Sequence, residues 1–290
     1  MPIKASELIL NEDGSVYHLN LRPEHISNTI ITVGDPDRVD SVTKHFDTIE
    51  LKIKKREFHT QTGTIGNKRL TVISTGIGTD NIDIVLNELD ALVNIDLERR
   101  EIKDNLTALD IIRIGTSGAI QDSIPLDSFL ISEYGCGFDS LLHFYQSNHV
   151  QQFEISNALK THLDWDVKKS DPYVVSCGHN LLQQISSDRT ITGFTATNVG
   201  FYGPQSRVLR LDVKDSDFND KLASFNYNDL SITNLEMETA GIYGLSKLLG
   251  HNALSMNAII ANRALGEFSS NPKDAVDKLI EYTLEKILEN

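Results

Sequence analysis

Gln205 and Arg207 are the first candidates for chemistry, in the stretch TNVGFYGPQSR that spans residues 197–207. The Gly203-Pro204 pair predicts a turn, and the polar residues after it would then be its solvated end. A glutamine amide and a guanidinium separated by one small residue also suit one planar ligand. The amide offers a donor and an acceptor, whereas the guanidinium offers donors only. The local pattern leaves both interpretations open.

Arg113 lies inside the apolar run IIRI (111–114), which otherwise predicts a strand covered on both faces. A buried guanidinium is costly unless it is paired, so we expect Arg113 to meet a carboxylate of the protein or a bound anion. Arg38 follows a Gly-Asp-Pro bend and Arg56 lies in the charged run KKREF, and each alone is typical of a surface arginine. With Thr116, these arginines could supply the bidentate hydrogen bonds and the hydroxyl that bind phosphate.

The stretch NLEMETAG places Glu236, Met237 and Glu238 where a predicted strand turns into a helix. Acidic residues favour helix starts through capping and the helix dipole. Alternatively, a carboxylate here accepts hydrogen bonds from two vicinal hydroxyls of a sugar, with Met237 against its apolar face. The local pattern does not separate these interpretations.

Glycine turns are predicted at three strand ends, in GDPDR (34–38), STGIG (74–78) and GTSGA (115–119). Ligands of open α/β sheets bind beyond the carboxyl ends of strands, and glycine lets backbone N–H groups approach an anion closely. Neither GxGxxG nor GxxxxGK[ST] occurs, which removes the usual support for a dinucleotide or ATP site.

The elements that position these groups alternate between strands and amphipathic helices, which predicts a single α/β domain over residues 1–290. Its central sheet is expected to be mixed, mainly parallel and flanked by helices. The charged insertion near 95–105, IDLERREIKDN, is expected to be a solvated extension or a continued helix. The predicted strands are 29–35, 68–78, 109–120, 127–135, 192–198, 231–237 and 253–263, and the predicted helices are 37–46, 81–95, 156–163, 237–250 and 273–288.

Composition narrows the class of protein. The 290-residue chain has a net charge of −14, which argues against nucleic-acid and anionic-membrane partners. Its 2 cysteines, Cys136 and Cys177, form no CxxC pair and so predict neither a metal site nor a disulfide framework. The N-terminus lacks a signal-like segment and no apolar run approaches about 20 residues. We therefore expect a cytoplasmic protein.

Seven segments occur in the order found in the nucleoside phosphorylase family: GDPDRV, KREF, STGIG, RIGTSGAI, FYGPQSR, LEMET and the strand through IIANR. The chain resembles this family from about Tyr17 to near its C-terminus, except for residues 95–105, and most closely its uridine phosphorylase branch. The resemblance implies cleavage of uridine by inorganic phosphate to uracil and ribose 1-phosphate. Phosphate is then a co-substrate, and no metal or organic cofactor is implied.

The resemblance also implies a phosphate site. Gly34, Arg38, Arg113 and Thr116 match the residues that hold phosphate within one subunit. Arg56 matches an arginine that a neighbouring subunit contributes. A homodimer is therefore the expected minimal active unit, and a homohexamer built from dimers is the alternative.

The ribose contacts implied by the resemblance are Met237 and Glu238, with Glu236 beside them. His18 matches a histidine that reaches the ribose 5′-hydroxyl from the neighbouring subunit, with Tyr17 beside it. As the glycosidic bond breaks the ribose becomes oxocarbenium-like, and Glu238 and the phosphate would stabilise that positive charge.

The base contacts implied by the resemblance answer the question that Gln205 raised. Phe201 matches the aromatic residue that packs on the base, Gln205 and Arg207 match the pair that reads uracil, and Arg263 matches the arginine supporting that pocket. The amide suits the O2 and N3–H edge, and Arg207 can donate to O4. These contacts strengthen as negative charge spreads onto the oxygens, so Gln205 and Arg207 count with Arg113 and Glu238 as catalytic.

Some features differ from the family pattern. The Gly203-Pro204 order is unusual for this turn. Glu57 and Ile77 match a monovalent-cation site between subunits, but Asn81 stands where some relatives have serine.

Two other functions fit parts of the pattern. Bacterial purine nucleoside phosphorylases carry an aspartate after the last core strand, where this chain has Asn262-Arg263. A catalytically inactive nucleoside-binding protein would have no need of the phosphate residues, which are all present.

Overall fold

The sheet begins with a unit that the sequence specifies closely. Strand β1 (Thr29–Val33) leads into helix α1 (Pro36–Thr43). The Asp35 carboxylate caps the helix by accepting from the Asp37 N–H at 2.9 Å, and Pro36 occupies the first turn, where its missing N–H is not needed. The predicted strand, bend and helix are confirmed, and they place Arg38 in the first turn of α1.

The computed structural model describes residues 2–289. Its remaining strands are β2 (Thr48–Lys55), β3 (Phe58–Ile65), β4 (Lys68–Ser74), β5 (Ile95–Asp96), β6 (Glu101–Ile102), β7 (Asp110–Ala119), β8 (Phe129–Gly137), β9 (Tyr173–Ser176), β10 (Thr190–Thr197), β11 (Asn226–Tyr227), β12 (Leu230–Glu236), β13 (Asn252–Asn262) and β14 (Glu267–Phe268).

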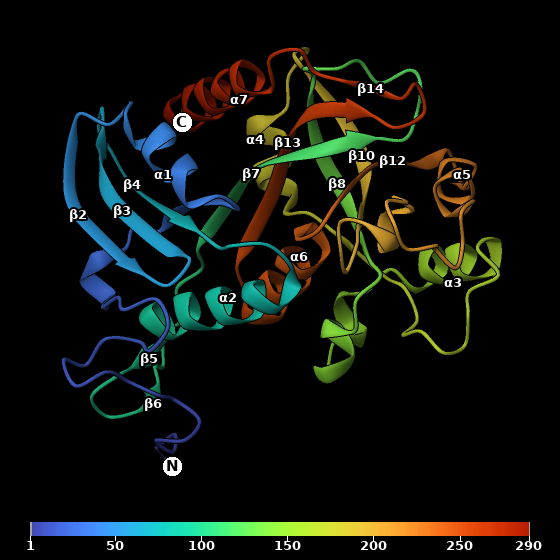
Figure 1. Cartoon of the computed structure of the whole chain (residues 1–290). Helices are drawn as coiled ribbons and strands as arrows, with labels where there is room; N and C mark the ends of the chain where they lie inside the picture. The colour runs from blue at the N-terminus through green and yellow to red at the C-terminus, as the bar shows by residue number, and fades with distance from the viewer. Residues whose placement is uncertain (1, 290) are drawn as a thin grey trace.

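Within the described residues, most of these strands join one 12-stranded sheet, whose main path is β11-β12-β10-β8-β13-β7-β1-β4-β3-β2 (Figure 1). Two blocks are parallel, β4-β1-β7-β13 and β8-β10-β12, and they meet antiparallel where β13 pairs with β8. β12 also pairs with the end of β7, so that Asn234 lies opposite Ala119. The sheet therefore curls back on itself, and the mixed α/β fold is confirmed.

Helices cover both faces of the sheet (Figure 1). The remaining helices are α2 (Thr79–Asn94), α3 (Phe153–His162), α4 (His179–Ile185), α5 (Phe218–Ala223), α6 (Thr239–Leu249) and α7 (Pro272–Leu288). α1, α4 and α7 pack on one side, against β3, β4, β7 and β13, whereas α6 packs on β8, β10 and β13 and is covered by α2. No helix within residues 2–289 combines the length and apolarity needed to cross a membrane.

The turn predicted at residues 115–119 is wrong. β7 continues through this segment and stays paired with β13 as far as Ala119. Gly115 serves a different purpose, because a Cβ atom there would lie 1.9 Å from Nη1 of Arg113. The glycine leaves the space that the guanidinium occupies.

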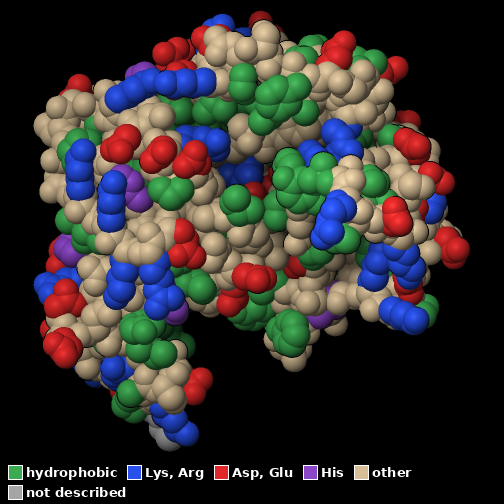
Figure 2. Space-filling model, viewed as in Figure 1, with side chains coloured by type: hydrophobic (Ala, Val, Ile, Leu, Met, Phe, Trp, Pro, Cys, Tyr) green, Lys and Arg blue, Asp and Glu red, His purple; other side chains and the backbone are tan. Residues whose placement is uncertain are grey.

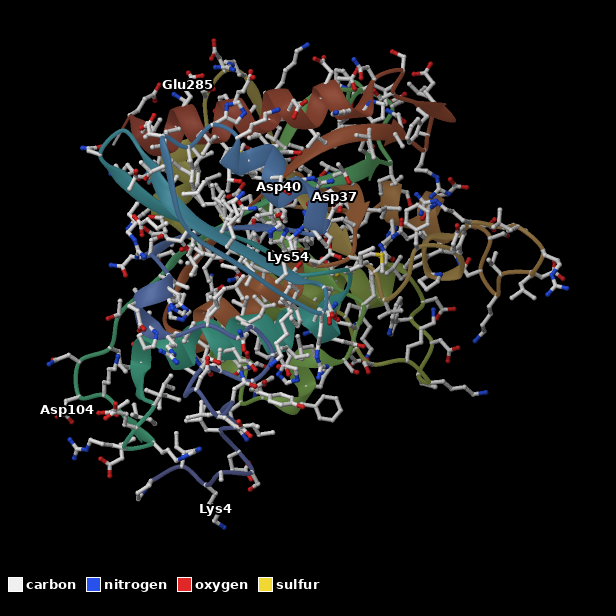
Figure 3. The ribbon with its side chains drawn as sticks, turned by 60° about the vertical axis from the view of Figure 1, so that its left-hand side comes forward. Lys4, Asp37, Asp40, Lys54, Asp104 and Glu285 are labelled. Atoms are coloured by element: carbon white, nitrogen blue, oxygen red, sulfur yellow. The ribbon has the colours of Figure 1, made fainter. Side chains whose placement is uncertain are left out.

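The charged insertion is a short hairpin and not a continued helix. α2 ends at Asn94, whose side chain donates to the Thr107 carbonyl at 3.1 Å and accepts from the Thr107 N–H at 2.7 Å. This pair folds the chain back at the helix end, so β5 and β6 project from it. The hairpin is solvated, as expected. Asp104 and Lys4 both lie in the lower part of the view in Figure 3, whereas Glu285 of α7 lies near the top.

Candidate active site

A cavity of about 500 Å³ gathers most of the residues that the sequence singled out. It lies where β1, β4 and β12 end, beside the middle of β7, and the loop 198–207 forms part of its wall. The surface is hollowed near the centre of the face in Figure 2, where basic and acidic side chains lie close together. The predicted residues that line the cavity are Gly34, Arg38, Ile77, Arg113, Thr116, Phe201, Gln205, Arg207, Glu236, Met237 and Glu238.

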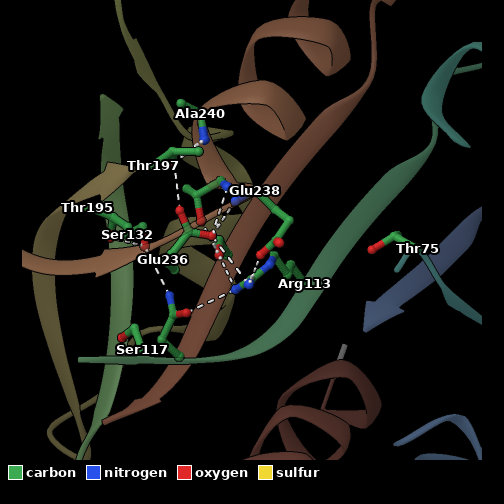
Figure 4. A network of polar contacts seen from close by, with 12 residues as sticks. Thr75, Arg113, Ser117, Ser132, Thr195, Thr197, Glu236, Glu238 and Ala240 are labelled. Atoms are coloured by element: carbon green, nitrogen blue, oxygen red, sulfur yellow. Dashed lines mark hydrogen bonds and ion pairs between the residues drawn. The ribbon is translucent and has the colours of Figure 1, made fainter. Parts of the chain in front are cut away.

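Arg113 is buried in the cavity wall, with 5% of its surface exposed. Its Nη2 lies 2.5 Å from Oε2 of Glu238 and 3.3 Å from Oε2 of Glu236, and its Nη1 donates to Oδ1 of Asn257 at 2.9 Å (Figure 4). Burial alone would lower the pKa of Arg113, but the two carboxylates outweigh burial and raise it. Of the two partners expected from sequence, the structure shows the carboxylates.

Glu236 and Glu238 both line the cavity but make different contacts. Glu236 satisfies the backbone at the start of α6, because its Oε2 accepts from the N–H groups of Glu238, the N-cap residue, and of Thr239 at 2.9 Å each. Its Oε1 accepts from the Thr197 hydroxyl at 2.6 Å. Glu238 faces the cavity, where its Oε1 accepts from the Gly78 N–H at 2.8 Å. Burial raises the pKa of Glu238, and the positive charge of Arg113 opposes that shift.

Arg38 reaches from α1 toward the same part of the cavity and is not the surface arginine that its local sequence suggests. Its Nη1 donates to the Ile114 carbonyl of β7 at 3.2 Å. Burial and the nearby charge of Arg113 lower the pKa of Arg38. Two guanidinium groups thus face one space beside Thr116 and Gly34, which favours an anion as ligand.

The loop that carries Gln205 and Arg207 turns through a short 3-10 helix at Gly203–Gln205, so the predicted turn is confirmed. Gln205 is buried, and its Oε1 accepts from Nη1 of Arg207 at 2.5 Å. Arg207 also donates to the Phe201 carbonyl at 2.7 Å, and its guanidinium carbon lies 3.8 Å from the centre of the Phe201 ring. The glutamine and the arginine therefore face each other as one unit at the cavity wall.

Arg263 supports this loop from outside the cavity lining. Its Nη1 lies 3.3 Å from the Gln205 carbonyl, which accepts the hydrogen bond. Burial, with the charge of Arg263 second, lowers the pKa of Arg207 to about 10. The guanidinium of Arg207 is thus destabilised, in contrast with that of Arg113.

Tyr17, His18 and Arg56 do not line the cavity of their own chain. Nδ1 of His18 lies 2.6 Å from Oε1 of Glu88, and Arg56 occupies the β2–β3 turn with a φ of 55°. The guanidinium of Arg56 lies 5.7 Å from the centre of the Tyr17 ring, so the three residues gather in one region. Their contribution to a neighbouring subunit stays a prediction.

The residues of the predicted cation site meet around Gly76. A Cβ atom on Gly76 would lie 2.4 Å from Nδ2 of Asn81 and 3.1 Å from Cγ of Glu57. Within residues 2–289, no three His, Cys, Asp or Glu side chains form a group that could hold a metal ion. A monovalent cation at this place stays a prediction.

Several cavity residues were missed by the sequence reasoning. Ser117 could have been found, because it follows Thr116 in a strand already marked as phosphate-binding. Phe268 comes from the short strand β14, and nothing in GEFSS suggests a ligand. The lining residues that were missed are Asp35, Pro36, Gly76, Ser117, Gly118, Leu235, Ile260, Ala261 and Phe268.

The sequence pattern of the phosphorylase superfamily matches residues 28–289, so the chain belongs to this superfamily. The match spans the sheet and every residue lining the cavity. The resemblance seen in the sequence is therefore confirmed at the level of the family.

The relatives act on more than one kind of nucleoside, judged by their names. A uridine phosphorylase of Haemophilus influenzae is 27% identical over 271 residues, which are 92% of this chain and 92% of the relative. A uridine phosphorylase of Thermococcus kodakarensis is 27% identical over 89% of this chain and 81% of its own length. A DeoD-type purine nucleoside phosphorylase of Buchnera aphidicola is 26% identical over 94% of this chain and 100% of its own length.

A solved structure gives the same picture. The chain superposes on a nucleoside phosphorylase of Trypanosoma brucei, described as showing uridine phosphorylase activity, with a TM-score of 0.87. The two are 29% identical, and the match covers 98% of this chain and 100% of the other.

Proposed function

We propose that this chain catalyses the cleavage of uridine by inorganic phosphate to uracil and ribose 1-phosphate, in pyrimidine nucleoside salvage. One observation carries the proposal. A single cavity contains two buried or half-buried arginines suited to an anion, Arg38 and Arg113, and a hydrogen-bonded Gln205–Arg207 pair suited to a planar base. The uridine phosphorylases among the relatives support it.

Phosphate would be held by Arg38, Arg113 and the Thr116 hydroxyl, with backbone N–H groups near Gly34. Charge-assisted hydrogen bonds of this kind are stronger than neutral ones. The phosphate so placed would attack C1′ on the face opposite the departing base, and no metal or organic cofactor would take part. Glu238 would accept from the ribose hydroxyls and stabilise the positive charge that develops on the sugar, with Met237 beside it.

The base would be read by Gln205 and Arg207 while Phe201 packs against it. Negative charge spreads onto the uracil oxygens as the glycosidic bond breaks, so donors from Arg207 and Gln205 bind the transition state more tightly than the substrate. Because Arg207 and Gln205 already contact each other at 2.5 Å, little reorganisation is needed to present both to one ligand.

Tyr17, His18 and Arg56 would act in the cavity of a neighbouring subunit, since they lie outside their own. We therefore propose a homodimer as the minimal active unit, with a hexamer of three dimers as the alternative, in the cytoplasm.

The second candidate function is purine nucleoside phosphorolysis, which the relative of Buchnera aphidicola favours. Asn262, the last residue of core strand β13, argues against it. Nδ2 of Asn262 donates to the carbonyls of Gln121 and Ile124, and its Oδ1 accepts from the N–H groups of Ala264 and Leu265. Asn262 is thus used in the fold, where a purine enzyme needs an acid for the base.

The test is a panel of uridine, deoxyuridine, thymidine, inosine and adenosine with purified protein, with and without phosphate, following release of the free base. We expect phosphate-dependent release of uracil from uridine, with inosine and adenosine inert. Inosine cleavage would assign the chain to purine phosphorolysis. No cleavage, with uridine still bound in calorimetry, would indicate an inactive nucleoside-binding protein.

A further inference from the structure

Five polar side chains cross the curled sheet at the back of the cavity, where apolar residues would be expected. We name Asn257 of β13, Ser132 of β8, Thr195 of β10, Asn234 of β12 and Ser117 of β7 the polar belt; each has 5% or less of its surface exposed. Figure 4 shows this network beside Arg113 and Glu236. Buried polar groups of this kind are costly unless every one is hydrogen-bonded.

The belt is continuous from one cavity residue to another. It starts at Nη1 of Arg113 and ends at Oγ of Ser117, and both residues line the cavity. The links are Arg113 Nη1 to Asn257 Oδ1 at 2.9 Å, Asn257 Nδ2 to Ser132 Oγ at 3.3 Å, Ser132 Oγ to Thr195 Oγ1 at 2.5 Å, Thr195 Oγ1 to Asn234 Oδ1 at 2.8 Å, and Asn234 Nδ2 to Ser117 Oγ at 2.9 Å.

Arg113 fixes the direction of the first two links, because a guanidinium can only donate. Asn257 turns its oxygen toward Arg113 and its NH₂ toward Ser132. At the other end, Oδ1 of Asn234 accepts from the Thr195 hydroxyl, and its NH₂ faces Ser117. Since Thr195 has one hydroxyl proton and gives it to Asn234, Ser132 is the donor in its contact with Thr195.

Ser117, the last member of the belt, has a hydroxyl proton that the belt does not use. Ser117 accepts from Nδ2 of Asn234, and its own hydroxyl proton has no acceptor among the described residues. Since Ser117 lines the cavity, that proton is available to an oxygen of a bound substrate.

We propose that the polar belt is a positioning device and that it makes Ser117 a hydrogen-bond donor to the substrate. Asn257 holds the guanidinium of Arg113, and Asn234 turns the hydroxyl of Ser117 into the cavity. This inference rests on the proposed function. The acceptor is an oxygen, which either phosphate or uridine supplies, so the two substrates are titrated separately.

Thr195→Val is the sharpest variant, because within residues 2–289 the Thr195 hydroxyl bonds only to members of the belt, and Thr195 is not among the residues that line the cavity. It removes the middle of the belt and nearly keeps the side-chain shape. Thr60→Val is the matched control, since Thr60 is a fully buried strand threonine whose hydroxyl has no partner within residues 2–289. We expect Thr195→Val to lower kcat/KM for uridine or phosphate about threefold to tenfold, the range of one neutral hydrogen bond. Thr60→Val should leave it unchanged.

Ser117 tests the other end of the belt. Ser117→Ala should lower kcat/KM by a similar factor, and Ser117→Thr, which keeps the hydroxyl, should restore most of it. In the double variant with Thr195→Val, the losses should not multiply, because both changes remove the same donated proton. The substrate whose KM rises is the one that supplies the acceptor.

For an active wild-type protein, the proposal is overturned by equal kcat/KM for Thr195→Val and Thr60→Val, or by losses that multiply in the double variant. Unfolding midpoints of all variants identify any loss that comes from folding alone, and such a loss in Thr195→Val also counts against it. If the wild-type protein cleaves no nucleoside, the proposed function fails by itself. Calorimetry with uridine and with inorganic phosphate then decides: weaker binding by Thr195→Val than by Thr60→Val supports the belt, and equal binding overturns it.

Discussion

The two arginines that face the ligand cavity sit in opposite surroundings. Arg113 projects from a central strand and is held by Glu236, Glu238 and Asn257, which come from two other strands and the start of a helix. Arg207 belongs to a loop and is held by that same loop, through the Phe201 carbonyl and Gln205. Arg113 is therefore held by residues from distant parts of the chain, whereas Arg207 is held by residues of its own loop.

Their charges differ accordingly. Carboxylates raise the pKa of Arg113 in spite of its burial, so its charge is favoured in the folded protein. Burial and the neighbouring Arg263 lower the pKa of Arg207 to about 10, so its charge is disfavoured there. Negative charge that develops on a base beside Arg207 would relieve that cost, and this suits a group that must bind the transition state more tightly than the ground state.

The largest expected effect is that of Arg113→Met. Without the guanidinium, two buried carboxylates face each other unpaired, and the free energy of unfolding should fall by about 3–5 kcal/mol. Urea titration at neutral pH measures this loss, and turnover at saturating uridine with varied phosphate measures the loss of function.

A second change separates the two roles of Arg113. Adding Glu238→Gln to Arg113→Met removes one of the unpaired charges, so part of the lost stability should return while turnover stays low. If the single variant keeps wild-type stability, the carboxylates do not depend on Arg113, and the contrast with Arg207 is lost.

Gln205→Ala should affect activity far more than folding. It removes a group aimed at the developing negative charge of the base, and loss of one such donor typically lowers kcat about 10²-fold. Steady-state kinetics with uridine, and unfolding by urea, measure the two effects. Gln121→Ala is the control, because the Gln121 amide donates to the carbonyls of Ala223 and Ile232 away from the cavity. A Gln205 variant with wild-type kcat/KM would exclude the base-reading role.

The strand-borne part of the site was largely predictable from sequence, and its surroundings were not. The position of Arg113 in an apolar run predicts that it needs a partner, but only the fold shows that Glu238 is that partner and that Gly115 leaves room for the guanidinium. The hairpin of β2 and β3 was missed because its outer strand carries alternating charges and is largely exposed. The polar belt was missed because its members lie on five strands that are far apart in the sequence, and its last link, from Asn234 to Ser117, exists only because the sheet curls until β12 meets β7.

Arg207→Gln is expected to have the smallest effect on stability. Its change in the free energy of unfolding is to be compared with the large loss expected for Arg113→Met. Because the folded-state pKa of Arg207, about 10, lies below the ordinary value of 12.5, its charge costs stability at every pH below about 10, and this cost disappears only as pH rises above that value. Removing the charge therefore offsets the loss of hydrogen bonds to Phe201 and Gln205. Since the side chain is half-exposed and screened by solvent, the free energy of unfolding should change by less than about 1 kcal/mol, equally at pH 6 and pH 9.

Uridine kcat/KM of the Arg207→Gln variant should still fall about tenfold, as expected for losing a charged hydrogen-bond donor. A loss of stability as large as that of Arg113→Met would show that the loop depends on its arginine in the same way as the sheet does.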